Sequence, residues 1–223
     1  GYELLVISGE EGVEGMRRLT ESALCDGILV MDVLDRDPRV EAARRSQIPS
    51  VFIGFSHDAD VVVATDTDFE AIGAGCAQRL HDAGHRRALV ISPASEHVTP
   101  MGFIHRFAQA LGKRASALGL TLQPVEVSRD FGSMQAALTA HLAGASPADA
   151  FIAAPTTSID DAINVLTANG LAPGADISVI GAGGSGDSPH TSVDYTHYDS
   201  DVPRVTETAV GLLVDQLEGL LPL

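Results

Sequence analysis

The strongest constraint on this chain is an alternation of two kinds of segment along its whole length. Short apolar runs bounded by turn residues alternate with longer stretches whose apolar residues recur with the period of an α-helix. The runs include "GILVMDV" at 27–33, "RALVIS" at 87–92, "DAFIAA" at 149–154 and "DISVIG" at 176–181. They are apolar throughout rather than at every second residue, which is typical of parallel strands covered on both faces. The pattern therefore predicts an α/β fold built from parallel sheets flanked by helices.

The remaining elements follow from the same two patterns. Further strands are expected at 3–7, 50–54, 61–64 and 124–127. Helices are expected at 103–118, at 133–142, and along the apolar faces Val13/Met16/Leu19/Ala23, Val40/Ala43, Phe69/Ile72/Cys76/Leu80 and Ile159/Ile163/Leu166. A last helix has Pro203 in its first turn, where a missing N–H costs nothing.

The predicted elements form a first group up to residue 65 and a second group from residue 66 onward. The last helix follows the second group, and we expect it to return and pack on the first. The chain then forms two interleaved lobes, with residues 1–65 and 196–223 in the first and residues 66–195 in the second. A length of 223 residues, 45% of them hydrophobic, is sufficient for two cores of about 100 residues each.

Charge and composition exclude several classes of function. Lys and Arg number 14 against 30 Asp and Glu, so the net charge of −16 repels a phosphate backbone and this chain alone should bind nucleic acid poorly. No apolar stretch approaches the ~20 residues that span a bilayer, so we expect no membrane segment. Cys25 and Cys76 stand far apart without metal-ligand spacing, which favours buried thiols over a disulfide or a zinc site. His81 and His85 span the helix end at Gly84, which favours a structural cap over a metal site.

"GAGGSG" at 181–186 is a G-x-G-x-x-G directly after a predicted strand. A dinucleotide site also needs a following helix whose N-terminus faces the phosphates. The sequence after Gly186 contains Pro189 and has no helical period, and the loop follows the last predicted strand of its lobe rather than the first. We therefore interpret it as a turn, and no nucleophile motif or P-loop accompanies it, so we expect neither a cofactor nor catalysis.

Several motifs occur together in a characteristic order. "CDGILVMDV", "IPSVFIG", "DTDFEAIGAGCAQRL", "LHDAGHRRALVI", "RFAQALGKRASALGL" and "DISVIG" together resemble the effector-binding domain of LacI-type bacterial transcriptional regulators over essentially the whole chain.

This resemblance implies a two-lobed, periplasmic-binding-protein-like domain of a cytoplasmic homodimer that senses a small, sugar-like effector. It implies dimer contacts through the helices at 69–82 and 158–168, and operator DNA contacts only through an N-terminal helix-turn-helix domain that is absent from this sequence. The first strand and helix of the first lobe and the closing strand also have no counterpart here. An extracytoplasmic solute-binding protein shares the fold and is the alternative, and an NAD(P)-dependent oxidoreductase is a weaker one.

Ligands of such folds bind at the carboxyl ends of the strands, which selects the candidate effector contacts. Arg106 matches the effector-contacting Arg of the family, with a surface salt bridge as the alternative. Asp32 follows a strand and can accept from a ligand hydroxyl or cap a helix. Phe55 can stack on a ring or belong to loop core, and Thr156 stands where the family carries Asn-Asp. Tyr195 lies at the return crossing, as an effector contact or a hydrogen-bonded hinge residue.

Gly183 is the last candidate and marks a departure from the family. It stands where the resemblance places an Asp that holds sugar hydroxyls, so the identity of the effector is open. The alignment also predicts that the fold tolerates Gly183→Asp.

Overall fold

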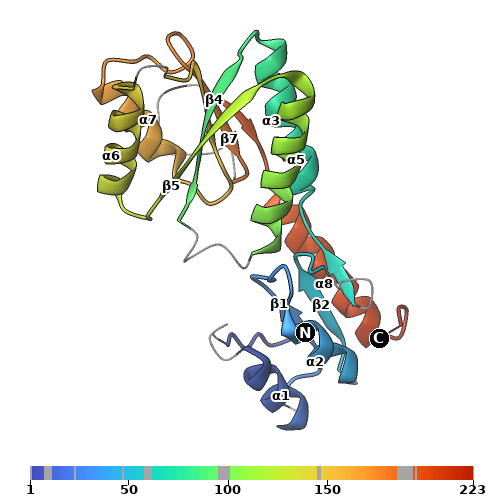
Figure 1. The fold of residues 1–223 in the computed structure, drawn as a ribbon. Coiled ribbons are helices and arrows are strands. Elements are labelled where there is room, and N and C mark those ends of the chain that lie inside the picture. The colour runs from blue at the N-terminus through green and yellow to red at the C-terminus, as the bar shows by residue number, and fades with distance from the viewer. Residues whose placement is uncertain are drawn as a thin grey trace. The chain divides into compact units, whose positions relative to one another are not determined.

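The computed structural model describes residues 2–7, 12–22, 24–46, 48–57, 62–94, 101–144, 147–184, 193 and 195–222. They form two compact units (Figure 1), each described here by itself. The first lies within Gly1–Thr67, Pro100–Phe103 and Val202–Leu223, and the second within Asp68–Thr99 and Ile104–Asp201. The predicted boundaries fell at residues 65 and 195.

The first unit has a parallel sheet of order β1-β2-β3, which is formed by Ile28–Val30, Ser50–Ile53 and Val63–Thr65. Its helices are α1 (Gly12–Ser22), α2 (Pro38–Arg45) and α8 (Val202–Leu217). Phe52 is buried in a core cluster with residues of α1 and α2. Its neighbour Val51 points to the opposite face because side chains alternate along a strand, and α8 contacts all three strands. The last helix therefore returns to the first group, as predicted.

The second unit has a five-stranded parallel sheet of order β5-β4-β6-β7-β8. Its strands are β4 (Arg87–Pro93), β5 (Thr121–Val127), β6 (Ala150–Ala153), β7 (Ser178–Ala182) and β8 (Thr196–Tyr198). The helices α3 (Phe69–Asp82) and α5 (Gly102–Leu118) cover one face, and α6 (Phe131–Leu142) and α7 (Ile159–Ala168) cover the other (Figure 1). The predicted α/β class with parallel sheets flanked by helices is confirmed.

Local sequence explains where the helices of this sheet begin. The side chains of Asp68, Asp130 and Ser158 each accept a hydrogen bond from a backbone N–H in the first turn, of α3, α6 and α7 respectively. Asp160 and Asp161 place negative charge in the first turn of α7, where the helix dipole favours it. Of these helices, α6 and α7 follow β5 and β6 of this sheet, so the polar groups of their first turns gather at its carboxyl edge.

One predicted strand is absent, and one strand was not predicted. Residues 2–7 form no strand, and Leu4 and Val6 are 85% and 82% exposed. An apolar run becomes a strand only where a neighbouring strand supplies hydrogen bonds, and none pairs with this segment among the described residues. Conversely β8, which was not predicted, is a short strand that pairs with β7.

No helix within the described ranges combines the length and the apolar character needed to cross a membrane.

Candidate functional site

A first cavity of about 270 Å³ lies at the carboxyl edge of the second unit's sheet. It is lined by the carboxyl ends of β6 and β7, by β8 and the residue before it, and by the start of α7. The lining residues are Ala153, Ala154, Thr157, Ser158, Ile159, Asp160, Gly181, Ala182, Gly183, Gly184, Tyr195 and His197. The predicted contacts Gly183 and Tyr195 therefore belong to one cavity, although they are distant in the sequence.

Tyr195 and His197 form the aromatic side of this cavity. Their rings meet edge to face, with centroids 6.0 Å apart and planes inclined by 65°. Burial, together with the negative charge of Asp160, raises the pKa of the Tyr195 phenol, so this group stays a neutral hydrogen-bond donor at physiological pH. A Cβ at Gly181 would lie 3.2 Å from the Tyr195 ring, so glycine there lets the ring lie close to the strand.

A second cavity of about 390 Å³ adjoins the first and shares Thr157 and Ser158 with it. It is lined by Pro93, Val127, Ser128, Arg129, Asp130, Met134, Thr156, Thr157, Ser158 and Asp161. These residues follow β5, β4 and β6, where the strand order reverses direction, and ligands of open α/β sheets bind in the crevice at such a point.

The charged groups of the second cavity were not predicted. Over the ranges that the structure describes, the Arg129 guanidinium and the Asp161 carboxylate make no hydrogen bond or ion pair with another side chain. A guanidinium and a carboxylate left unpaired in one cavity can donate to and accept from adjacent hydroxyls of a ligand. The sequence signal that could have identified Asp161 is its place in the first turn of a helix that follows a strand, because such turns lie at the carboxyl edge of the sheet.

Thr156 lines the second cavity in an unusual conformation, with a φ of +67°. A β-branched residue rarely adopts positive φ, and such outliers gather at functional sites. The next residue holds the turn in place, because the Thr157 hydroxyl donates to the Ile91 carbonyl oxygen at 3.2 Å. The predicted contact Thr156 is therefore exposed on a fixed loop.

Gly183 and Gly184 end β7 with φ of +95° and +98°. The Gly183 N–H donates to the Tyr198 carbonyl oxygen at 2.9 Å, and the Gly184 N–H donates to the Ser200 hydroxyl at 3.1 Å. An L side chain at position 183 would be strained at this φ, although its Cβ would meet only ordinary contacts, so the tolerance of Gly183→Asp stays a prediction. Residues 185–192, which contain the rest of the glycine loop and the segment where a following helix would begin, lie outside the described residues. The strand before it is present, but β7 is followed by β8 and is not the last strand of its sheet.

In the first unit, the predicted contacts Asp32 and Phe55 follow β1 and β2. Asp32 is exposed with a φ of +51°, and Phe55 is 41% exposed, so it is not loop core. The alternative role of Asp32 as a helix cap is wrong, because the cap of α2 is Asp37, whose carboxylate accepts from the Arg39 N–H at 2.9 Å.

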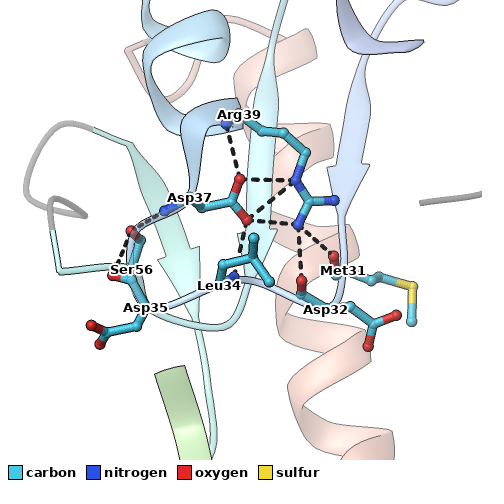
Figure 2. Close-up of polar contacts among 7 residues, drawn as sticks. All are labelled: Met31, Asp32, Leu34, Asp35, Asp37, Arg39 and Ser56. Carbon is cyan, nitrogen blue, oxygen red and sulfur yellow. Dashed lines mark hydrogen bonds and ion pairs between the residues drawn. The ribbon is translucent and has the colours of Figure 1, made fainter. Parts of the chain in front are cut away.

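Asp37 and Arg39 form a buried ion pair beside these two residues (Figure 2). The Asp37 side chain is fully buried and the Arg39 side chain is 13% exposed, and the shortest distance between the carboxylate and the guanidinium is 2.7 Å. Burial alone would raise the pKa of the Asp37 carboxyl, but hydrogen bonds from the Arg39 side chain and from the backbone N–H groups of Leu34 and Arg39 outweigh it, so this pKa lies below its usual value. The carboxylate therefore stays charged in the folded protein.

Arg106 lies in the second turn of α5, is half-buried and does not line either cavity. Its role as an effector contact stays a prediction.

A third polar cluster lies at the opposite, amino edge of the second unit's sheet. His85 Nε2 shares a hydrogen bond of 2.8 Å with the Ser178 hydroxyl, in which the donor depends on the tautomer of the ring. His85 Nδ1 lies 3.3 Å from Asp149 Oδ1. The order Ser-His-Asp is that of a hydrolase triad, but neither cavity includes these residues. The cluster ties the end of α3 to the start of β7, in agreement with the structural role expected for His85. Within the described ranges, no group of three or more His, Cys, Asp or Glu is arranged to hold a metal ion.

The family model described as periplasmic binding protein-like domain matches residues 77–220. No curated protein sequence matches the chain.

Solved structures match the fold over nearly all of the chain. A LacI family transcriptional regulator from Bifidobacterium animalis is 17% identical, with a TM-score of 0.84 over 96% of this chain and 78% of that one. A putative transcriptional regulator from Yersinia pestis is 22% identical, with a TM-score of 0.83 over 97% and 78%. The transcriptional regulator CelR in complex with cellobiose is 24% identical, with a TM-score of 0.75 over 96% and 65%.

Proposed function

Because the chain belongs to the periplasmic binding protein-like domain family, we propose that it is the effector-binding and dimerisation part of a LacI-type transcriptional regulator. In this proposal a small polyhydroxylated molecule binds at the carboxyl edge of the second unit's sheet and changes the DNA affinity of the intact, cytoplasmic regulator. The fold, which resembles that of several such regulators, supports the proposal, as does the agreement in order of the sequence motifs.

The observation that carries the ligand class is the pair of adjoining cavities at this edge. They combine an unpaired guanidinium and carboxylate, from Arg129 and Asp161, with the aromatic side chains of Tyr195 and His197. Sugars carry groups that complement both kinds of side chain. Their hydroxyls hydrogen-bond to the charged groups, and their apolar C–H faces pack on the aromatic rings. The cellobiose complex of a regulator with the same fold favours the same class.

The missing Asp at position 183 does not remove acidic groups from the edge. Asp160 and Asp161, in the first turn of α7, line the first and the second cavity respectively. We propose that these carboxylates take over hydrogen bonding to ligand hydroxyls. Asp32, Phe55 and Arg106 stay predicted effector contacts.

A thermal-shift screen with cellobiose, other sugars, polyols and nucleosides tests the proposal. A ligand present at about 100 times its Kd stabilises the folded state by about 2.7 kcal/mol and raises the melting temperature. We expect at least one polyhydroxylated compound to do so. Its affinity should fall about tenfold or more in Arg129→Gln, because a hydrogen bond to a charged group contributes about 1.5–3 kcal/mol.

Arg87→Gln is the matched control, because Arg87 is exposed at the amino end of β4 in the same sheet. A compound that binds Arg129→Gln and Arg87→Gln equally well contradicts the proposed site. An effector that leaves the operator affinity of the intact regulator unchanged contradicts the regulatory role.

A further inference from the structure

The loop after β1 is held by one guanidinium that contacts two successive carbonyl groups (Figure 2). Arg39 Nη2 donates to the Met31 carbonyl oxygen at 3.0 Å and to the Asp32 carbonyl oxygen at 2.9 Å. These carbonyls belong to the two peptide planes on either side of the Asp32 Cα. Holding both planes on one donor therefore fixes φ and ψ of Asp32.

That fixed conformation is one that few side chains adopt. Asp32 has a φ of +51°, in the left-handed region where Asp and Asn are tolerated better than other non-glycine residues. Its carboxylate points away from the guanidinium (Figure 2), and over the described residues it forms no hydrogen bond or ion pair. The hydrogen bonds from Arg39 thus hold the backbone of Asp32 and leave its side chain available.

The guanidinium is itself held by a buried carboxylate. Asp37 Oδ2 accepts from Arg39 Nη2 at 2.7 Å, and Asp37 Oδ1 accepts from Arg39 Nε at 3.0 Å. The Leu34 N–H donates to the same carboxylate at 3.0 Å. A two-point pairing of this kind fixes the plane of the guanidinium as well as its position.

The same network reaches the loop that carries Phe55. The Asp37 N–H donates to the Ser56 hydroxyl at 3.1 Å, and this hydroxyl donates to the Asp35 carbonyl oxygen at 3.1 Å. Ser56 is 6% exposed, whereas the adjacent Phe55 is 41% exposed. The buried polar groups therefore fix the loop while the aromatic ring stays at the surface.

We propose that the Asp37–Arg39 pair is a positioning device that presents the Asp32 carboxylate and the Phe55 ring to the effector. The carboxylate accepts from ligand hydroxyls and the ring packs on an apolar C–H face, so the device favours a carbohydrate-like ligand. Arg39 acts through Asp32 and does not contact the ligand. This inference rests on the proposed function for its ligand, but its structural part does not.

Crystal structures of the wild type and of Arg39→Lys test the structural part without any ligand. Lysine keeps the charge beside Asp37, but a single ammonium does not reproduce the planar fork that spans the carboxylate and both carbonyls. We expect φ of residue 32 to change from positive to negative in Arg39→Lys. Arg36→Lys is the matched control, because Arg36 is an exposed residue of the same loop. A φ at residue 32 that stays positive in Arg39→Lys overturns the proposal.

Titration calorimetry with cellobiose as the probe tests the functional part. Asp32→Asn keeps a residue that tolerates the left-handed conformation but removes the charge, and we expect the Kd to rise about tenfold. Arg39→Lys should weaken binding to a similar extent, and the double variant no more than either single one, because both act on one group. If the double variant raises the Kd by the product of the two single factors, the two residues act independently and the positioning role is overturned. Failure of the wild type to bind cellobiose counts against the proposed function for that sugar, while the crystal structures still decide the role of Arg39.

Asp32→Gly covers the case in which Arg39→Lys does not fold. Glycine adopts positive φ without strain, so this variant should melt about 2–4 °C above the wild type if the conformation at residue 32 is imposed on it. A melting temperature equal to or below that of the wild type overturns the proposal in that case.

Discussion

At the scale of single residues, burial decides what an ion pair contributes. The pKa of the Asp37 carboxyl is lowered although the group is fully buried, because its hydrogen bonds outweigh the cost of burial. Hydrogen bonds from Arg44 and then Arg45 lower the pKa of Glu41 to about 2, yet this side chain is 45% exposed. Solvent and salt screen the ion pairs of Glu41 with Arg44 and Arg45, so these pairs contribute little to stability.

Asp37→Asn should therefore destabilise the protein strongly at neutral pH. The substitution leaves the Arg39 charge buried without its partner, which costs about 3–5 kcal/mol. Because the pKa of Asp37 is lower in the folded state than its unfolded value of about 3.9, its stabilisation is complete above that pH. It is lost as the pH falls through the folded pKa. Urea unfolding at a series of pH values should show the gap between wild type and variant shrinking below about pH 4.

Glu41→Gln is the control for this experiment and should change the urea midpoint little at any pH. A gap for Asp37→Asn that grows toward acid pH contradicts the assigned direction of the pKa shift.

At the scale of elements, the second unit depends on a close contact between α3 and α5. A Cβ at Gly73 of α3 would lie 2.4 Å from the Phe107 carbonyl oxygen and 3.0 Å from the Leu111 backbone nitrogen of α5. Both are backbone atoms, which cannot turn aside as a side chain does. Only glycine permits this approach of the two helices.

Gly73→Ala should destabilise the protein by about 1–3 kcal/mol through overpacking. Gly112→Ala is its control within α5, because nothing lies within 4 Å of a Cβ there. That variant should instead stabilise by about 0.5–1 kcal/mol, since alanine loses less entropy than glycine in a helix. Urea midpoints of the two variants should move in opposite directions. Equal shifts would contradict the helix contact.

At the scale of the whole molecule, a net charge of −16 has to be reconciled with a role in DNA regulation. The charge opposes contact between this chain and a phosphate backbone. In the proposed regulator, DNA is bound by a separate domain, and this chain contributes effector binding and dimerisation. Like-charged copies then associate only where their contact faces offset the repulsion.

Sedimentation velocity at micromolar concentration should show a dimer, with α3 and α7 as the proposed contact helices. Asn164, on the exposed face of α7, is the position at which to test this. Asn164→Arg should raise the dimer Kd about tenfold or more, because a desolvated charge lacks a partner at an interface. Gln135→Arg, at an exposed position of α6, is the control. A monomeric wild type, or equal effects of both variants, contradicts the proposed interface.

The sequence alone determined the type and order of most elements and the parallel α/β class. Helix periodicity and apolar runs are short-range patterns that record which faces become buried. The stripe from Phe69 to Leu80 and the run at 87–92 therefore correspond to α3 and β4. The motifs likewise indicated the LacI-type fold, since they carry order and spacing along the chain.

Only the tertiary structure decided which segments pair and which side chains meet. Residues 2–7 are apolar but unpaired, whereas the polar segment of β8 becomes a strand because β7 lies beside it. Arg129 and Asp161 share a cavity although a helix and a strand separate them in the sequence. The φ of Gly183 also depends on a partner outside the local sequence, because the Gly183 N–H donates to the Tyr198 carbonyl oxygen. Strand pairing and side-chain clusters are long-range contacts, and no local pattern encodes a partner that the fold alone brings near.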